Sequence, residues 1–186
     1  MKKNHLGIAI GIFMALLSLF PQFYFQIKRG DAFNGATFYY DYDESAYASY
    51  LQSLIDGSPR KNNIYENSNQ SQTGESFLTI QFVAAYVVAI PARILGLSSD
   101  TAFLVVSVVF SFLASLAVFW LLLLVTENPY LSTVGTLFVL LFGTNVSGAS
   151  IINELLGFGS TFFYLTFLRR YTPAVSFPFI FFLIET

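Results

Sequence analysis

Residues 101–125 read TAFLVVSVVFSFLASLAVFWLLLLV, a run of 25 residues without a charged side chain. A helix of that length extends about 37 Å at ~1.5 Å per residue, enough to cross the roughly 30 Å hydrocarbon core of a bilayer with some tilt. The run from Tyr130 to Ser150 is also uncharged and long enough to span. These two runs predict an all-α fold, a polytopic integral membrane helical bundle.

The composition of the whole chain agrees with a membrane protein. Hydrophobic residues make up 55% of the 186 residues and charged residues 11%, against roughly 25% charged in an ordinary soluble domain. The net charge of −2 offers no electrostatic surface for nucleic acid. The absence of Cys and the single histidine, His5, exclude disulfide scaffolds, thiolate or multi-histidine metal sites and Cys nucleophiles. Any catalysis must therefore use carboxylates, hydroxyls, Arg, Lys or Tyr.

The N-terminus resembles a secretory signal, with Lys2 and Lys3 followed by an uncharged run from Leu6 to Phe20. Bulky aromatic residues follow that run in place of a small-residue cleavage site. We therefore predict an uncleaved signal anchor in residues 1–27, with a cleaved signal peptide as the alternative. The two lysines predict a cytoplasmic N-terminus, in a bacterial inner (plasma) membrane.

Residues 28–76 hold seven acidic and four basic residues, a net charge of −3 that suits an extracytoplasmic loop. Within this loop, Ser45–Asp56 is predicted to form an amphipathic helix. Its apolar residues recur at i, i+1, i+4 and i+5: Ala46, Tyr47, Tyr50, Leu51, Leu54 and Ile55. The sequence Gly57-Ser58-Pro59 is a helix-stop signal.

Residues 77–186 are predicted to form a membrane region. Phe77–Leu97 is long enough to span but contains Pro91 and Arg93, so both an interfacial and a spanning placement stay open. We expect Pro91 to break its helix. Near the end, Ala174–Ile184 is apolar but is followed only by Glu185 and Thr186, so residues 174–186 are expected to be the start of a truncated helix and the chain an N-terminal fragment.

The densest polar cluster is YYDYDE at residues 39–44, with Asp41, Asp43 and Glu44 within four positions. Carboxylates this close raise one another's pKa or bind a divalent cation, and either property suits general-base chemistry. A structural alternative is that Asp41 or Asp43 caps the helix predicted to begin at Ser45. The two roles are compatible, because a cap would fix the geometry of the acid.

The layout of residues 6–150 resembles the GT-C glycosyltransferases, which include protein O-mannosyltransferases and the lipid A aminoarabinose transferases. The resemblance rests on an Asp43-Glu44-x-x-Tyr47 motif after the first helix, the turn Leu54–Gly57, and a second apolar segment that ends in Leu95-Gly96. It implies a membrane enzyme that moves a sugar from a polyprenyl-phosphate-linked donor to an extracytoplasmic acceptor. The implied partners are membrane lipid and that donor.

Carried over by position, Asp43 matches the family's catalytic carboxylate, with Glu44 beside it. The resemblance implies that Asp43 is the general base that takes a proton from the acceptor. Tyr47 stands at the family's aromatic position and, with Asp41, is expected to bind substrate. Asp41-x-Asp43 also resembles a metal-binding motif of some members, which would hold Mg²⁺ or Mn²⁺, whereas other members need no metal.

Arg169 and Arg170 are the paired bases late in the chain, and the resemblance implies that they bind the donor phosphate. Their alternative role is an ordinary interfacial anchor. The chain departs from the family in length and in having Glu75–Leu78 where Pro-Pro-Leu is usual. A non-enzymatic membrane protein, such as a transporter fragment or an assembly subunit, therefore stays the second hypothesis. The enzyme is favoured because the apolar runs before Arg93 carry no ionisable residue.

Overall fold

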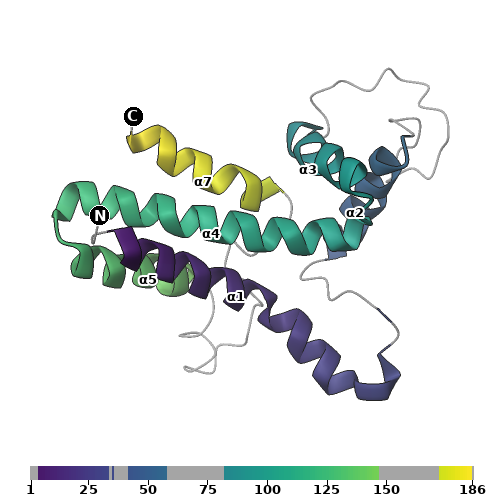
Figure 1. Ribbon diagram of the computed structural model, residues 1–186, viewed down its shortest axis with the longest axis horizontal. Coiled ribbons are helices and arrows are strands. Elements are labelled where there is room, and N and C mark those ends of the chain that lie inside the picture. The colour runs from purple at the N-terminus through teal and green to yellow at the C-terminus, as the bar shows by residue number, and fades with distance from the viewer. Residues whose placement is uncertain (1–3, 34, 36–41, 58–81, 147–171, 186) are drawn as a thin grey trace.

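The computed structural model describes residues 4–33, 35, 42–57, 82–146 and 172–185, and every regular element in these ranges is a helix (Figure 1). The elements are α1 (Asn4–Arg29), η1 (Gly30–Ala32), α2 (Tyr42–Ile55), α3 (Phe82–Leu95), α4 (Ser99–Thr126), α5 (Pro129–Val146) and α7 (Thr172–Glu185). The predicted all-α fold is confirmed for this part of the chain.

Among the described elements, the long helix α4 is central and contacts the five other α-helices. Figure 1 shows the first half of α1 antiparallel to α4, with α5 folding back after a tight turn and α7 along the opposite side of α4. The remaining two helices, α2 and α3, pack at the Ser99 end of α4. The N-terminus of α1 and the turn between α4 and α5 lie together at the opposite end.

Two helices of the described chain are long and apolar enough to cross a membrane, namely α1 continued through η1 and α4. Their 29 and 28 residues correspond to more than 40 Å of helix at ~1.5 Å per residue. The predicted anchor in residues 1–27 and the predicted run at 101–125 match these helices to within a few residues. The predicted span at 130–150 corresponds to α5, and residues 147–150 lie outside the described ranges.

Two glycines of α1 pack directly against aromatic rings of α4. A Cβ atom added to Gly7 would lie 2.6 Å from Cδ1 of Phe119, and one added to Gly11 would lie 2.7 Å from Cδ2 of Phe112. Such a small-x-x-x-small spacing lets helices approach closely where surrounding lipid offers no hydrophobic drive for association. Gly7 and Gly11 therefore set the closeness of the main helix pair.

Three hydroxyl groups buried in these long helices are bonded within their own helix, whereas the buried Ser111 hydroxyl of α4 has no hydrogen-bond partner among the described residues. The hydroxyl of Ser18 donates to the Ala15 carbonyl at 2.7 Å, that of Ser107 to the Phe103 carbonyl at 3.0 Å, and that of Ser115 to the Ser111 carbonyl at 2.7 Å. Local bonding of this kind satisfies the hydroxyl without water. These serines thus act as small residues that an apolar environment can accommodate.

A two-residue turn joins α4 to α5. Glu127 ends α4 in the left-handed conformation at φ 54°, and its N–H donates to the Leu123 carbonyl at 2.9 Å. The side chain of Asn128 then accepts from the N–H groups of Tyr130 and Leu131, and Pro129 occupies the first helical position, where its missing N–H costs nothing. Asn128 and Pro129 are residues that favour the start of a helix, here α5, whereas Glu127 ends α4 in a conformation that glycine adopts more easily.

Candidate functional site

The first turn of α2 carries Asp43 and Glu44. The helix begins at Tyr42, three residues before the predicted Ser45, so Asp43 lies within the first turn and does not precede the helix. A residue at that position is near the positive end of the helix dipole, where an acid is favoured. The capping alternative for Asp43 is therefore replaced by a position inside the turn, and Asp41 lies outside the described residues.

The apolar face of α2 packs into a cluster that we call the end cluster. Its buried members are Ala48, Tyr50, Leu51, Leu54 and Ile55 of α2, Ala84, Ala85, Val88, Ala89 and Ala92 of α3, and Ala102, Phe103 and Val106 of α4. Tyr47 packs against it and is partly buried. The predicted amphipathic helix is thus observed, and its large side chains meet the alanine face of α3.

Glu44 is only 4% exposed, although it is an acidic residue. Its neighbour Asp43 is one helical position away, and adjacent positions on a helix do not face each other. Glu44 therefore lies on the packed side of α2. Burial of an acid at the start of a helix is favourable only with partners and the helix dipole to support it.

Gln52 fastens α2 to the start of α4. Its Oε1 atom accepts from the backbone N–H of Ser99 at 2.9 Å, and its Nε2 atom donates to Oδ1 of Asp56 at 2.9 Å. The Ser98 hydroxyl accepts from the Thr101 N–H at 3.4 Å. The first turn of α4 is thus capped from its own chain and from α2, satisfying N–H groups that have no partner within the helix.

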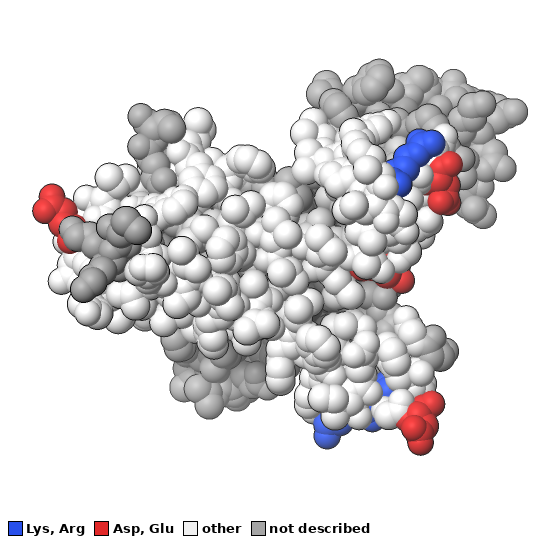
Figure 2. Space-filling model, viewed as in Figure 1, with Lys and Arg blue, Asp and Glu red and all other residues white. Residues whose placement is uncertain are grey.

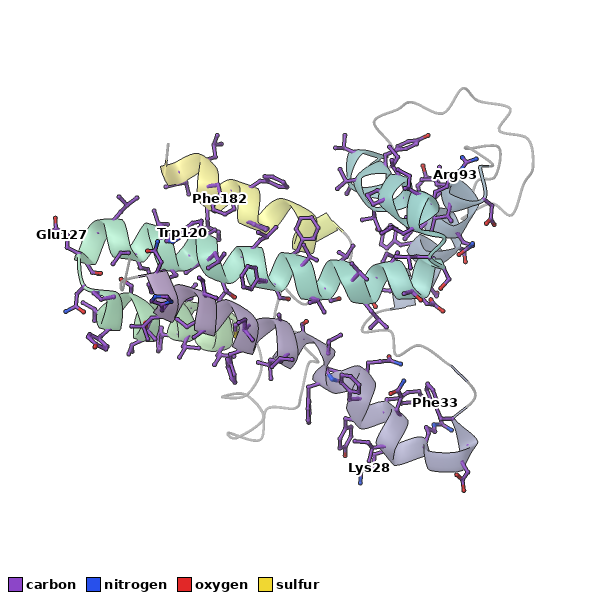
Figure 3. The ribbon with its side chains drawn as sticks, in the orientation of Figure 1. Lys28, Phe33, Arg93, Trp120, Glu127 and Phe182 are labelled. Atoms are coloured by element: carbon purple, nitrogen blue, oxygen red, sulfur yellow. The ribbon has the colours of Figure 1, made fainter. Side chains whose placement is uncertain are left out.

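Arg93 of α3 lies against the C-terminal end of α2 (Figure 3). A Cβ atom added to Gly57, which has φ +81°, would lie 3.0 Å from each terminal guanidinium nitrogen of Arg93. A cation beside the last turn of a helix complements its partial negative charge. The sequence suggested a topological role for Arg93, whereas the structure adds this contact.

Helix α3 continues through Pro91, so the prediction that proline breaks the segment is wrong. Pro91 is exposed, and its ring is accommodated on the side of α3 away from the end cluster. The helix stops at Gly96, which has φ +64°, and the Leu97 N–H donates to the Ala92 carbonyl at 2.8 Å. This is the closing bond of a Schellman motif, which only a residue tolerant of positive φ allows easily.

Several predicted site residues cannot be placed together. Arg169 and Arg170 lie outside the described residues, as does Asp41. Among the described residues no group of three or more His, Asp or Glu side chains is arranged to hold a metal ion. The Mg²⁺ or Mn²⁺ site at Asp41 and Asp43 thus stays a prediction.

Sequence reasoning missed Gln52, and the signal for it is weak. Gln52 lies beside the apolar face of α2, a position where a polar residue ordinarily faces water. Its bonding partner Ser99 is 47 residues away, and no local pattern links the two.

No protein-family model, curated protein or solved structure matches this chain. Its function must be argued from its own residues. What they provide is a carboxylate pair on the first turn of a helix fixed to the end of a long apolar helix.

Proposed function

We propose that this chain belongs to a membrane glycosyltransferase that moves a sugar from a polyprenyl-phosphate-linked donor to an extracytoplasmic acceptor. The observation that carries the proposal is the attachment of α2, which begins with Tyr42-Asp43-Glu44, to the start of α4 through Gln52. A catalytic carboxylate must be held to within about 0.5 Å of its productive position, and helices provide that better than loops. The resemblance to GT-C enzymes supports the same pair of residues.

The membrane part of the proposal rests on how charge is distributed. Figure 2 shows a face whose charged side chains gather at the two ends of the long axis, with an uncharged band between them. In the proposed topology α1 and α4 span the bilayer, the N-terminus and the Glu127 turn are cytoplasmic, and α2 and α3 lie at the extracytoplasmic interface. The described part of α3 has 14 residues and covers about 21 Å at ~1.5 Å per residue, while residues 77–81 lie outside the described ranges. The interfacial placement of this segment is part of the proposal.

The chemistry assigns one role to each group. Asp43 accepts the proton of an acceptor hydroxyl or amine as that atom bonds to the anomeric carbon of the sugar. The bond from the anomeric carbon to the phosphate oxygen breaks, and polyprenyl phosphate leaves with the electron pair. Buried Glu44 supports the turn that carries Asp43, and Tyr47 borders the acceptor. Arg169 and Arg170 bind the phosphate in this scheme.

Asp43→Asn is the decisive test of the proposed enzyme. The natural gene product that contains these residues, in membranes, is incubated with polyprenyl-phosphate sugars extracted from the same cells, and release of polyprenyl phosphate is followed by mass spectrometry. General-base contributions are typically ~10²- to 10⁴-fold, so turnover should fall by that factor at normal expression. The control is Asp31→Asn, an exposed acid in η1, which should leave turnover unchanged. Full turnover in Asp43→Asn would favour the non-enzymatic alternative.

The proposed topology has its own test, and the absence of Cys simplifies it. Ser49 is exposed on α2 and Glu127 is exposed at the opposite end of the molecule. A cysteine at position 49 should react with an impermeant maleimide in intact cells, and one at position 127 only after permeabilisation. The reverse pattern would contradict the topology and leave the chemical assignment of Asp43 without its extracytoplasmic substrate.

A further inference from the structure

The second half of α1 leaves the helix bundle. Figure 1 shows the first half lying along α4 and the second half running away from it. Pro21 lies inside the second half of the helix, and proline removes a backbone hydrogen bond and commonly bends a helix. Four apolar side chains of this half are exposed: Phe20 at 59%, Phe23 at 55%, Tyr24 at 50% and Ile27 at 78%. Their spacing of i, i+3, i+4 and i+7 places them on one helix face.

Two cations follow this apolar face. The Nζ atom of Lys28 lies 5.5 Å from the centroid of the Tyr24 ring, and the Cζ atom of Arg29 lies 5.3 Å from that of Phe25 (Figure 3). Each cation is therefore held against an aromatic ring one turn earlier. Both side chains are exposed, and within the part of the chain that the structure describes neither has an ion-pair partner.

We infer that Phe20, Phe23, Tyr24, Ile27, Lys28 and Arg29, the distal α1 surface, bind an anionic phospholipid. The apolar side chains lie against the acyl chains, and the two cations contact the phosphate. The order apolar, aromatic, cationic along the helix matches the order of hydrocarbon, interface and headgroup across a leaflet. The inference rests on the proposed membrane placement and not on sugar transfer.

Charge and geometry favour a lipid over a protein partner. The guanidinium of Arg29 matches a phosphate in bidentate geometry, and the ammonium of Lys28 adds a second positive charge beside it. Long basic side chains next to an apolar face extend their charged ends to the membrane interface. The nearby acid Asp31 is exposed and, among the described residues, forms no ion pair with either cation, so anionic lipid supplies their counter-charge. Each such cation near an anionic surface strengthens binding several-fold.

Native mass spectrometry of the purified full chain in detergent tests the inference. Phosphatidylglycerol and phosphatidylcholine with identical acyl chains are offered at equal concentration, and bound lipid is counted. The wild-type chain should retain phosphatidylglycerol with a preference of roughly tenfold or more, since two cations contribute. The double variant Lys28→Gln/Arg29→Gln should lose most of this preference. Arg93→Gln removes an exposed cation elsewhere and should keep it.

Two outcomes would overturn the inference. One is an unchanged phosphatidylglycerol preference in Lys28→Gln/Arg29→Gln with helix content equal to wild type by circular dichroism. The other is displacement of phosphatidylglycerol by an equal concentration of undecaprenyl phosphate in the wild type but not in the double variant, which would assign the surface to the donor lipid. Extraction of the chain from membranes by alkaline carbonate reports separately on the proposed membrane placement.

Discussion

The helices pack through different kinds of side chain in the two buried clusters of the described chain. The end cluster joins α2 and α3 to the start of α4, and the second cluster, which we call the bundle cluster, joins α1 and α5 to the rest of α4. The buried members of the bundle cluster are Ile10, Met14, Val118, Phe119 and Leu140. In the end cluster large side chains meet an alanine face, whereas in the bundle aromatic rings meet glycines.

The two regions also differ in how polar groups are satisfied. At the end cluster Gln52 bonds across helices to Ser99, while Ser18, Ser107 and Ser115 in the long helices bond to carbonyls of their own helix. A bond between elements orients one helix on another, and a bond within a helix leaves orientation to packing alone. Helix orientation at the proposed site therefore depends on polar contacts, whereas the closeness of helices in the bundle depends on small residues.

The largest effect is expected in the end cluster. Leu51 is fully buried, so Leu51→Ala should lower the free energy of unfolding by about 2–5 kcal/mol and release α2 from α3 and α4. Thermal unfolding in detergent, followed by circular dichroism, measures the loss. Leu124→Ala, at a 62% exposed position, is the control and should be near neutral. Equal losses in the two variants would mean that the end cluster has no packed core.

Glycine replacements test the bundle. In Gly11→Ala the new methyl group would meet the ring of Phe112 at 2.7 Å, and in Gly135→Ala it would meet only the terminal Cδ1 atom of Leu122 at 2.9 Å. Both changes gain about 1 kcal/mol of helix propensity. Overpacking costs about 1–3 kcal/mol where the neighbour cannot move aside, so Gly11→Ala should be destabilised relative to Gly135→Ala. Thermal unfolding in detergent measures both variants. Identical stabilities of Gly11→Ala and Gly135→Ala would show that the Phe112 ring moves aside without cost.

Removing the polar contact tests orientation directly. Gln52→Ala leaves the Ser99 N–H without its acceptor, and a typical intramolecular hydrogen bond contributes ~0.5–1.5 kcal/mol. We expect a small loss of stability together with a broader distance distribution between spin labels at Ser49 and Glu127. Ser53→Ala is the control, because the Ser53 hydroxyl bonds to the Tyr50 carbonyl of its own helix. An unchanged distance distribution in Gln52→Ala would mean that apolar packing, and not this hydrogen bond, orients α2.

The smallest effect should be a gain. Glu127 adopts a positive φ of 54°, which costs a residue with a side chain roughly 1 kcal/mol more than glycine. Glu127→Gly should therefore raise the midpoint of thermal unfolding slightly. Glu127→Ala, which keeps the strain, is the matched control, and an equal gain there would attribute the effect to the lost charge.

Much of the fold could be predicted, because long uncharged runs leave few choices. The ends of α4 lie within two residues of the predicted run at 101–125, and α2 has the apolar face expected from its periodicity. The course of α3 through Pro91 was not predicted, since proline's local penalty is offset here by packing of the opposite alanine face. Tertiary contacts override local preference in such a case.

The candidate site was less predictable than the fold. The Asp43-Glu44 pair could be found as a motif, but the burial of Glu44 depends on which side of α2 meets the end cluster. The contact of Arg93 with the end of α2 joins residues that are distant in the chain. Periodicity reports the faces of single helices and does not report which faces meet.

The contact between the Phe119 ring and Gly7 also limits which substitutions the sequence can accept during evolution. A larger residue at position 7 is excluded while the ring remains at position 119, and a smaller residue at 119 leaves a void while glycine remains at 7. Either single step passes through a less stable protein, so the two positions should vary together among descendants of this chain. Substitutions at positions 7 and 119 are therefore expected to be coupled, although the two residues lie on different helices.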